Sequence, residues 1–178
     1  MQTPRMPSTT PGWAIWLWAT GGVVVILLQA VWRLTPRALT VFDGTLGAGY
    51  LLIAAGWVAF MAYAESYRGF HLMFNPRVIV RAAGVAEQPT PLHVAMAPLV
   101  AMGLVHGTPR RLLVSRVLVA GIVVLILLVR WLPEPWRAIV DLGVVVGLLL
   151  GTLSLVGMAI QAALGSPPNV DPEFPEPA

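Results

Sequence analysis

The chain has 178 residues, of which 57% are hydrophobic and only 11% charged, and its mean hydropathy is +0.79. Soluble domains carry about 25% charged residues, so this composition excludes an ordinary soluble protein and predicts an integral membrane protein. The chain has no cysteine, which excludes disulfides, thiolate metal sites and cysteine nucleophiles. All eleven basic residues are arginine and lie between apolar segments, a pattern typical of lipid phosphate contacts and not of a nucleic-acid interface.

Four segments are long and apolar enough to cross a bilayer, whose core of roughly 30 Å needs about 20 apolar helical residues. They cover residues 13–32, 46–64, 112–132 and 138–164. A fifth apolar run, residues 92–106, is shorter and is interrupted by Pro98. We therefore predict an all-α fold: a polytopic transmembrane helical bundle of four spanning helices plus a short buried or re-entrant apolar helix, with five spans as the alternative.

The limits of these spans divide the chain into three regions. Residues 1–12 form a cytoplasmic N-terminal segment, and residues 13–164 form a single transmembrane domain with a cytoplasmic connector at residues 65–111. Residues 165–178 form an acidic, proline-rich tail. The tail has almost nothing apolar to bury, so we expect it to be disordered.

Arginine counts indicate the orientation, because cytoplasmic flanks of membrane helices are enriched in Lys and Arg. If residues 92–106 cross the membrane, the arginines divide five to six and favour neither side. If they do not cross, seven lie on the side of the N-terminus and four on the other. The seven are Arg5, Arg68, Arg77, Arg81, Arg110, Arg111 and Arg116; the four are Arg33, Arg37, Arg130 and Arg137. The counts favour four spans in a bacterial inner membrane, with both termini cytoplasmic.

The last span contains "GVVVGLLLG", in which Gly143, Gly147 and Gly151 recur every four residues and lie along one helix face. Small residues let helices approach closely in lipid, where the hydrophobic drive between helices is weak. Ala55 and Ala59 on the second span offer a plausible partner surface. The motif predicts close helix packing, either within this bundle or between subunits.

The connector contains the most distinctive stretch, "YAESYRGFHLMFNPRVIVRAAGVAEQPTP", residues 63–91. Asn75 followed by Pro76 is typical of a helix N-cap with proline in the first turn, so we expect a short interfacial helix over residues 76–86. Its arginines suit lipid headgroups, because a guanidinium group binds phosphate through two hydrogen bonds. The candidate headgroup- or partner-binding residues are Arg68, Arg77, Arg81, Arg110 and Arg111.

Ionisable residues near the spans all lie within about one turn of a span end, where side chains reach the interface. In the four-span arrangement Glu65 and Arg116 meet at the cytoplasmic side, and Arg130 and Asp141 meet across the outer turn. We expect both to be ion pairs that align the bundle. A transporter would place charges or broken helices at the bilayer midplane, so the apolar midplanes do not favour transport.

The histidines that bound the fifth apolar run are the only candidate cofactor ligands. On a straight helix His93 and His106 would lie about 20 Å apart, so they share a metal ion only if the chain reverses near Pro98. One imidazole suffices as an axial ligand of haem or a chlorophyll-type pigment, which leaves such a cofactor as an alternative. Metal-binding spacings such as HExxH are absent from the sequence, and we expect neither a metal nor a resident cofactor.

The sequence contains no nucleophile with a base, no paired carboxylates and no phosphate loop, so we assign no catalytic residues. We expect a non-catalytic accessory, assembly or structural subunit of a bacterial membrane complex. Its expected partners are membrane lipids and other membrane subunits or further copies of itself. One alternative is an enzyme that acts on lipid or isoprenoid phosphates through Glu65, Arg68, His71 and Arg77. The other is a haem- or pigment-binding membrane anchor.

Overall fold

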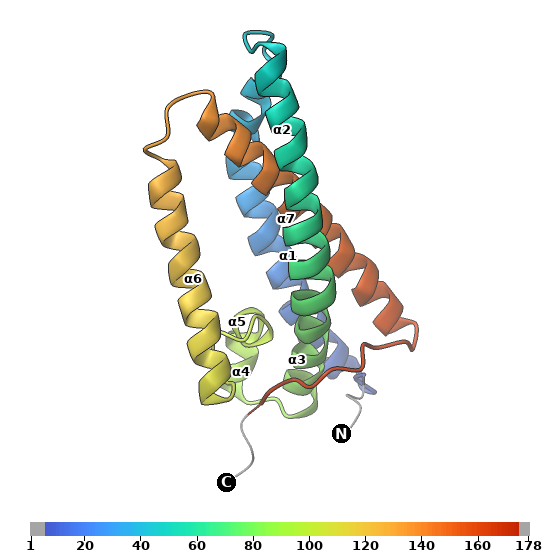
Figure 1. Cartoon of the computed structure of the whole chain (residues 1–178). Helices are drawn as coiled ribbons and strands as arrows, with labels where there is room; N and C mark the ends of the chain where they lie inside the picture. The colour runs from blue at the N-terminus through green and yellow to red at the C-terminus, as the bar shows by residue number, and fades with distance from the viewer. Residues whose placement is uncertain (1–5, 175–178) are drawn as a thin grey trace.

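The computed structural model describes residues 6–174, and the regular structure of this part of the chain is entirely helical (Figure 1). Four helical stretches are long and apolar enough to cross a membrane: Thr10–Phe42, Ala48–Glu87, Pro109–Val129 and Trp136–Ala163. The expected helical bundle with four candidate spans is therefore confirmed at this level.

The first span consists of helix α1 (Thr10–Ala38), which continues into the short 3-10 helix η1 (Leu39–Phe42). Thr9 caps its start, since the Thr9 hydroxyl accepts a hydrogen bond of 3.2 Å from the backbone N–H of Gly12. One stripe of α1 is buried at helical spacing. The stripe consists of Trp16, Ala19, Val23 and Leu27.

The second candidate span is one continuous helical stretch of 40 residues, much longer than the sequence predicts. It comprises α2 (Ala48–Met61), the π-helical segment η2 (Ala62–Phe74) and α3 (Asn75–Glu87). A regular helix of this length measures roughly 60 Å, about twice the thickness of a bilayer core. The expected interfacial helix 76–86 is therefore the buried last part of this stretch.

Asn75 does not act as the expected N-cap, because the backbone is already helical before it. Its side chain is fully buried, and Asn75 Nδ2 donates a hydrogen bond of 3.1 Å to the carbonyl of Gly151 on α7 (Trp136–Ala163). A tertiary contact to α7 thus satisfies the amide that the sequence assigns to a local cap.

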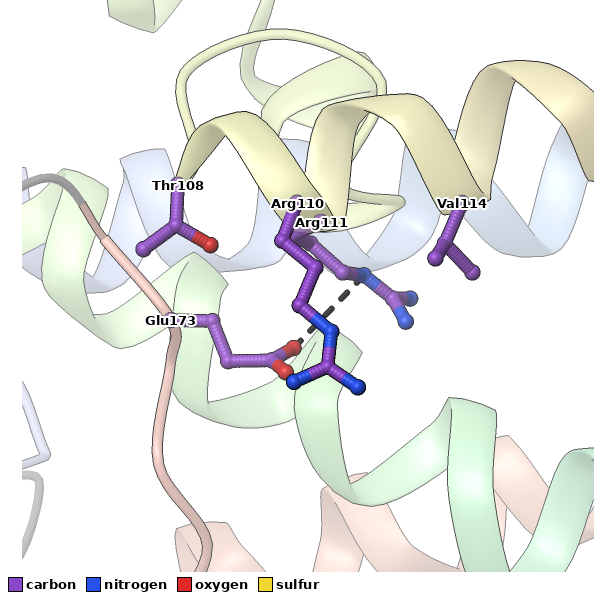
Figure 2. A pocket seen from close by; sticks show the side chains of 5 residues that line it. All are labelled: Thr108, Arg110, Arg111, Val114 and Glu173. Carbon is purple, nitrogen blue, oxygen red and sulfur yellow. Dashed lines mark ion pairs between the residues drawn. The ribbon is translucent and has the colours of Figure 1, made fainter.

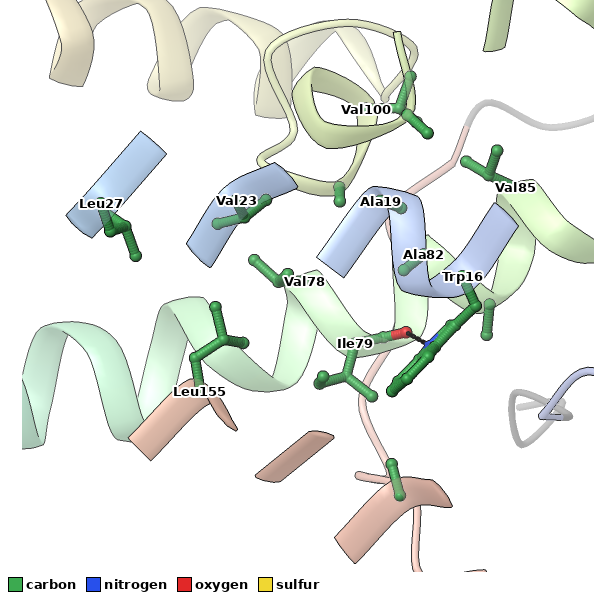
Figure 3. Packing of buried hydrophobic residues seen from close by; sticks show 14 residues of the cluster. Trp16, Ala19, Val23, Leu27, Val78, Ile79, Ala82, Val85, Val100 and Leu155 are labelled. Atoms are coloured by element: carbon green, nitrogen blue, oxygen red, sulfur yellow. Dashed lines mark hydrogen bonds between the residues drawn. The ribbon is translucent and has the colours of Figure 1, made fainter. Parts of the chain in front are cut away.

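The main core lies where α1, α3 and α7 meet (Figure 3). Trp16 of α1 donates a hydrogen bond of 3.3 Å from its indole N–H to the carbonyl of Ile79, which ties α1 to α3. Nine of the thirteen residues of α3 are buried, so this segment packs inside the bundle and does not lie on its surface as the sequence predicts. The buried residues around this bond include Ala19, Val23, Val78, Ala82, Val85, Val100 and Leu155.

Residues 92–106 form two short helices, α4 (Pro91–Ala95) and α5 (Ala97–Ala101), followed by an irregular turn. Each has five residues and is about 7.5 Å long, far too short to span a membrane. α5 is buried against α1 and α3, with Pro98 seated on Gly22, where a side-chain methyl group would overlap the proline ring. The structure thus has the short buried element and not a fifth span.

Helix α6 (Pro109–Val129) stands apart from the other long helices along most of its length (Figure 1). Its residue Ser115 is buried, but every residue from 116 to 128 is exposed. That stretch covers about three and a half turns, so all sides of α6 are uncovered.

Helix α7 crosses α1 and also packs on α2 and η2. From its end, the segment 165–174 runs back along the bundle towards the start of α6 (Figure 1). The start of α1, the end of α3 and the start of α6 lie at this same end of the bundle, which we call the termini end.

Candidate functional site

The three glycines of α7 face the second candidate span within the same chain. Side-chain methyl groups on Gly143, Gly147 and Gly151 would overlap Trp57, Glu65 and Phe70 respectively. Glu65 and Phe70 are five residues apart, yet both face α7. In a π-helix the turn is wider than in an α-helix, so residues five apart lie on nearly the same side of η2. The glycines thus make room for large side chains.

Ala55 and Ala59, the surface expected to meet these glycines, lie elsewhere. Both are exposed on α2, while the buried residue of that helix is Ala54. The expected pairing of small residues with small residues is replaced by glycines that face large side chains.

The two expected ion pairs do not form within residues 6–174. Glu65 lies on the side of η2 that faces Gly147, whereas Arg116 belongs to α6, which stands away from the bundle. Arg130 is exposed at the end of α6, and Asp141 is buried in the first part of α7. Arg116 lies on α6 and Arg130 at its C-cap, and α6 stands apart from the other long helices, which explains why neither pair forms within the described part of the chain.

An ion pair does occur at the end of the bundle opposite the termini. Arg37 Nη1 lies 3.5 Å from Glu134 Oε1, and both side chains are exposed. An exposed pair of this kind contributes little to stability. Beside it lies a pocket of about 390 Å³ lined by Arg33, Pro36, Arg37, Thr40 and Glu134.

The four residues considered as an enzyme cluster do not share one set of neighbours, although Glu65 and His71 both contact α7. Glu65 packs on α7, Arg68 is exposed, and Arg77 contacts the C-terminal segment. His71 Nδ1 forms a hydrogen bond of 2.7 Å with the hydroxyl of Ser154 on α7. Within the described residues, no hydrogen bond or ion pair joins these four side chains to one another.

An arginine cluster at the termini end is the most concentrated charged site in the described structure. Three arginines surround the carboxylate of Glu173 in the C-terminal segment: Arg81 Nη2 lies 2.7 Å from Glu173 Oε2, Arg77 Nε 3.4 Å and Arg111 Nε 3.6 Å. Figure 2 shows the contact between Arg111 and Glu173. We call Arg77, Arg81, Arg110 and Arg111 the arginine cluster; Arg110 lies beside Glu173 in the same view. Four of the five arginines expected to bind a headgroup or partner therefore meet here, and Arg68 does not.

Arg81 is the most deeply buried member, with a side chain only 2% exposed. It also donates a hydrogen bond of 2.8 Å from Nε to the carbonyl of Pro172. Gly103, which has a positive φ of 74°, turns the chain against this guanidinium group, and a side chain there would collide with Arg81. A buried guanidinium needs such partners, because an unpaired buried charge is strongly unfavourable.

The C-terminal segment is held by its backbone as well as by its charge. The N–H of Thr108 donates to the carbonyl of Glu173 at 3.0 Å, and the N–H of Glu173 donates to Asp171 Oδ1 at 2.6 Å. Phe174 packs over Gly84 of α3. Composition predicts disorder for residues 165–178; residues 165–174 lie against the bundle here, and residues 175–178 fall outside the described part.

A pocket of about 310 Å³ opens beside Glu173 at the start of α6 (Figure 2). Its volume lies near the lower limit of small-molecule sites, about 300–1,000 Å³. Arginine side chains and one carboxylate line one part, and an apolar side chain continues onto α6. The lining residues are Thr108, Arg110, Arg111, Val114 and Glu173.

The chain reverses between His93 and His106, which brings the two imidazoles together with their ring centres 4.1 Å apart. This reversal is the condition under which the two histidines could share a ligand. Within the described residues, no group of three or more His, Cys, Asp or Glu side chains is close enough to hold a metal ion. Burial and the neighbouring charge of His93 lower the pKa of His106 below its ordinary value.

Lowering the pH from about 7.5 to about 5.5 is expected to reduce the thermal stability of the protein in detergent through His106. The unfolded chain takes up a proton near the ordinary histidine pKa of about 6.5, whereas folded His106 takes it up only at lower pH. Stability that is present above the unfolded pKa is therefore lost as the pH falls through both values. We expect His106→Asn and, to a lesser degree, His93→Gln to reduce this loss of Tm. An equal loss in all three proteins would contradict the assignment.

The fold and the site define a class: an all-helical bundle with four helices long and apolar enough to span a membrane, and an arginine cluster at its termini end. Comparison with protein-family models, with curated proteins and with solved structures finds no match for this chain. A functional proposal therefore depends on the geometry described above.

Proposed function

We propose that the protein is a non-catalytic subunit of a bacterial membrane complex that joins a partner subunit through α6. The observation that carries this proposal is the exposure of every residue from 116 to 128 of that helix. The other three candidate spans pack on one another. A helix uncovered on all sides offers a continuous apolar surface to a second membrane protein.

Exposure alone does not distinguish a partner from lipid, because lipid tails are as apolar as leucine. Charge supplies a second argument. Arg116 and Arg130 lie near the two ends of the exposed stretch, and within residues 6–174 neither takes part in an ion pair. Between them, Gly121 has open space around it, where another backbone fits closely. The matching partner is an apolar helix with carboxylates near both membrane surfaces.

The same charges favour a different protein over a second copy of this chain. Copies inserted in one membrane share one orientation, so two α6 helices side by side would place like charges at the same height. Arg116 would then face Arg116, and Arg130 would face Arg130. Like charges in contact are unfavourable, so self-association through α6 is the weaker arrangement.

The proposed location is the bacterial inner membrane, with the termini end in the cytoplasm. The sequence count supports this orientation, because seven of the eleven arginines belong to the side of the N-terminus and four to the other side, and cytoplasmic flanks of membrane helices are enriched in arginine.

Photo-crosslinking in the native host tests the partner. A photoreactive residue at Ile122 of α6 is expected to give a product with another membrane protein, identified by mass spectrometry. The matched control is Leu52, an equally apolar exposed residue on α2. Products only with lipid, or only with a second copy of the chain, would contradict the proposal, as would equal yields of one product from both positions.

A further inference from the structure

Within residues 6–174, the arginine cluster has more positive charges than the carboxylate of Glu173 can neutralise. Arg77 and Arg81 of α3 and Arg111 at the start of α6 contact the carboxylate of Glu173. Arg110 lines the pocket beside that carboxylate. Guanidinium groups this close repel one another unless an anion lies among them. Among residues 6–174, the one carboxylate in contact with these guanidinium groups carries one negative charge, so the described part of the cluster has a positive excess.

The hydrogen bonds of the cluster are also incomplete. Arg111 Nε is buried and, among the described residues, finds no hydrogen-bond partner, since Glu173 lies 3.6 Å away. Arg77 contacts Glu173 at 3.4 Å and donates its hydrogen bond of 2.7 Å to the carbonyl of Met73 on its own helix. Arg110 has no ion pair within residues 6–174. A group with more acceptor oxygens than a carboxylate would satisfy these donors better.

Phosphate has that chemistry, because it offers several acceptor oxygens and suits the planar fork of arginine. The pocket of about 310 Å³ beside Glu173 supplies the space, with Arg110 and Arg111 on its wall. Its apolar wall is Val114, which lies at the start of the exposed face of α6. A phosphate bound here can therefore belong either to a free anion or to a lipid whose chains follow α6.

The C-terminal segment that carries Glu173 can dissociate from the arginine cluster without unfolding a helix. Residues 166–174 have no regular secondary structure, so their release unfolds no helix. Glu173 has a positive φ of 55°, a conformation that residues other than glycine rarely adopt. The bound segment is held in this conformation by its contacts with Arg81 and Thr108.

We propose that the arginine cluster is a binding site for a phosphate group, and that Glu173 occupies this site until a phosphate-bearing ligand displaces the C-terminal segment. The cluster lies at the end of α6, outside the stretch assigned to the partner, so this inference stands independently of the proposed function.

The test uses the full chain with Val170→Cys, which carries one nitroxide spin label because the natural sequence has no cysteine. Inorganic phosphate is added to the protein in a neutral detergent, with sodium chloride at matched ionic strength as the control. In parallel, the protein is placed in nanodiscs of phosphatidylcholine with or without phosphatidic acid. Label mobility reports release of the segment, and a titration gives the apparent Kd.

We expect phosphatidic acid, inorganic phosphate or both to mobilise the label, whereas chloride does not. Mobilisation by phosphatidic acid alone assigns the site to lipid headgroups, and mobilisation by inorganic phosphate shows that the free anion suffices. Failure of both probes would overturn the proposal.

Substitutions decide whether binding competes with Glu173. Glu173→Gln is expected to lower the apparent Kd about tenfold, because the competing charge is removed. Arg110→Gln, at an exposed position of the pocket, is expected to raise it, while Arg68→Gln, an exposed arginine outside the cluster, leaves it unchanged. An unchanged Kd in both Glu173→Gln and Arg110→Gln, or an equal effect of Arg68→Gln, would overturn the assignment.

Discussion

Replacing Gly151 by valine is expected to destabilise the bundle by about 3 kcal/mol. A Cβ atom at this position would lie 2.5 Å from the ring of Phe70, close to its attachment to the backbone of η2. A side chain cannot yield there without moving the helix, so the added atoms force the two helices apart. The separation would also stretch the hydrogen bond from Asn75 to the carbonyl of Gly151. Denaturant unfolding in detergent measures the effect.

Gly157→Val is the matched control for this prediction. It lies on the same helix, but a side chain there meets open space. The change in helix propensity is the same at both positions and cancels in the comparison. Equal destabilisation by the two substitutions would show that the contact between α7 and η2 does not limit stability.

The glycine spacing predicts one feature of α7 well and another poorly. Its repeat of four places Gly143, Gly147 and Gly151 on one face, and that face packs closely in the structure. The partner residues could not be read from the sequence because a search for small residues at α-helical spacing assumes a regular helix. The π-helical turns of η2 change which residues face α7. These turns could not be predicted from the local sequence.

The spans follow from apolar length alone, which is why four of them could be predicted from the sequence. The length of the second helical stretch could not be predicted from the sequence. The pair Asn75–Pro76 is compatible both with a helix start and with a position where proline is tolerated inside a longer helix. The choice depends on the contact between Asn75 and α7, and only the folded chain brings these together.

The arginine cluster could be predicted in part for a similar reason. Its arginines could be named from the connector, but Glu173 is separated from Arg81 by 92 residues. Its surroundings are rich in proline, which predicts disorder. Phe174 is the signal that could have indicated docking, because an aromatic residue beside an acid is unusual in a segment that buries nothing. It packs over Gly84 in the structure.

Replacing Asn75 by aspartate is expected to have the second large effect, about 3–5 kcal/mol at neutral pH. The substitution keeps the size of the side chain but removes the N–H donor to the carbonyl of Gly151. It also places a carboxylate in a fully buried position against a carbonyl oxygen, and a buried charge without a partner is strongly destabilising. Asn169, an exposed residue of the C-terminal segment, supplies the matched control as Asn169→Asp.

Measurements at lower pH distinguish the effect of the buried charge from the effect of altered packing in the Asn75→Asp protein. When the pH falls, the carboxyl of the Asn75→Asp protein takes up a proton and its O–H can again donate to the carbonyl of Gly151. The folded form of this variant favours the neutral carboxyl, because the charged form is buried without a partner, so the stability deficit shrinks towards low pH. Measuring the free energy of unfolding of both proteins against pH distinguishes the two causes. A deficit that stays constant with pH would mean that packing, and not the buried charge, destabilises the variant.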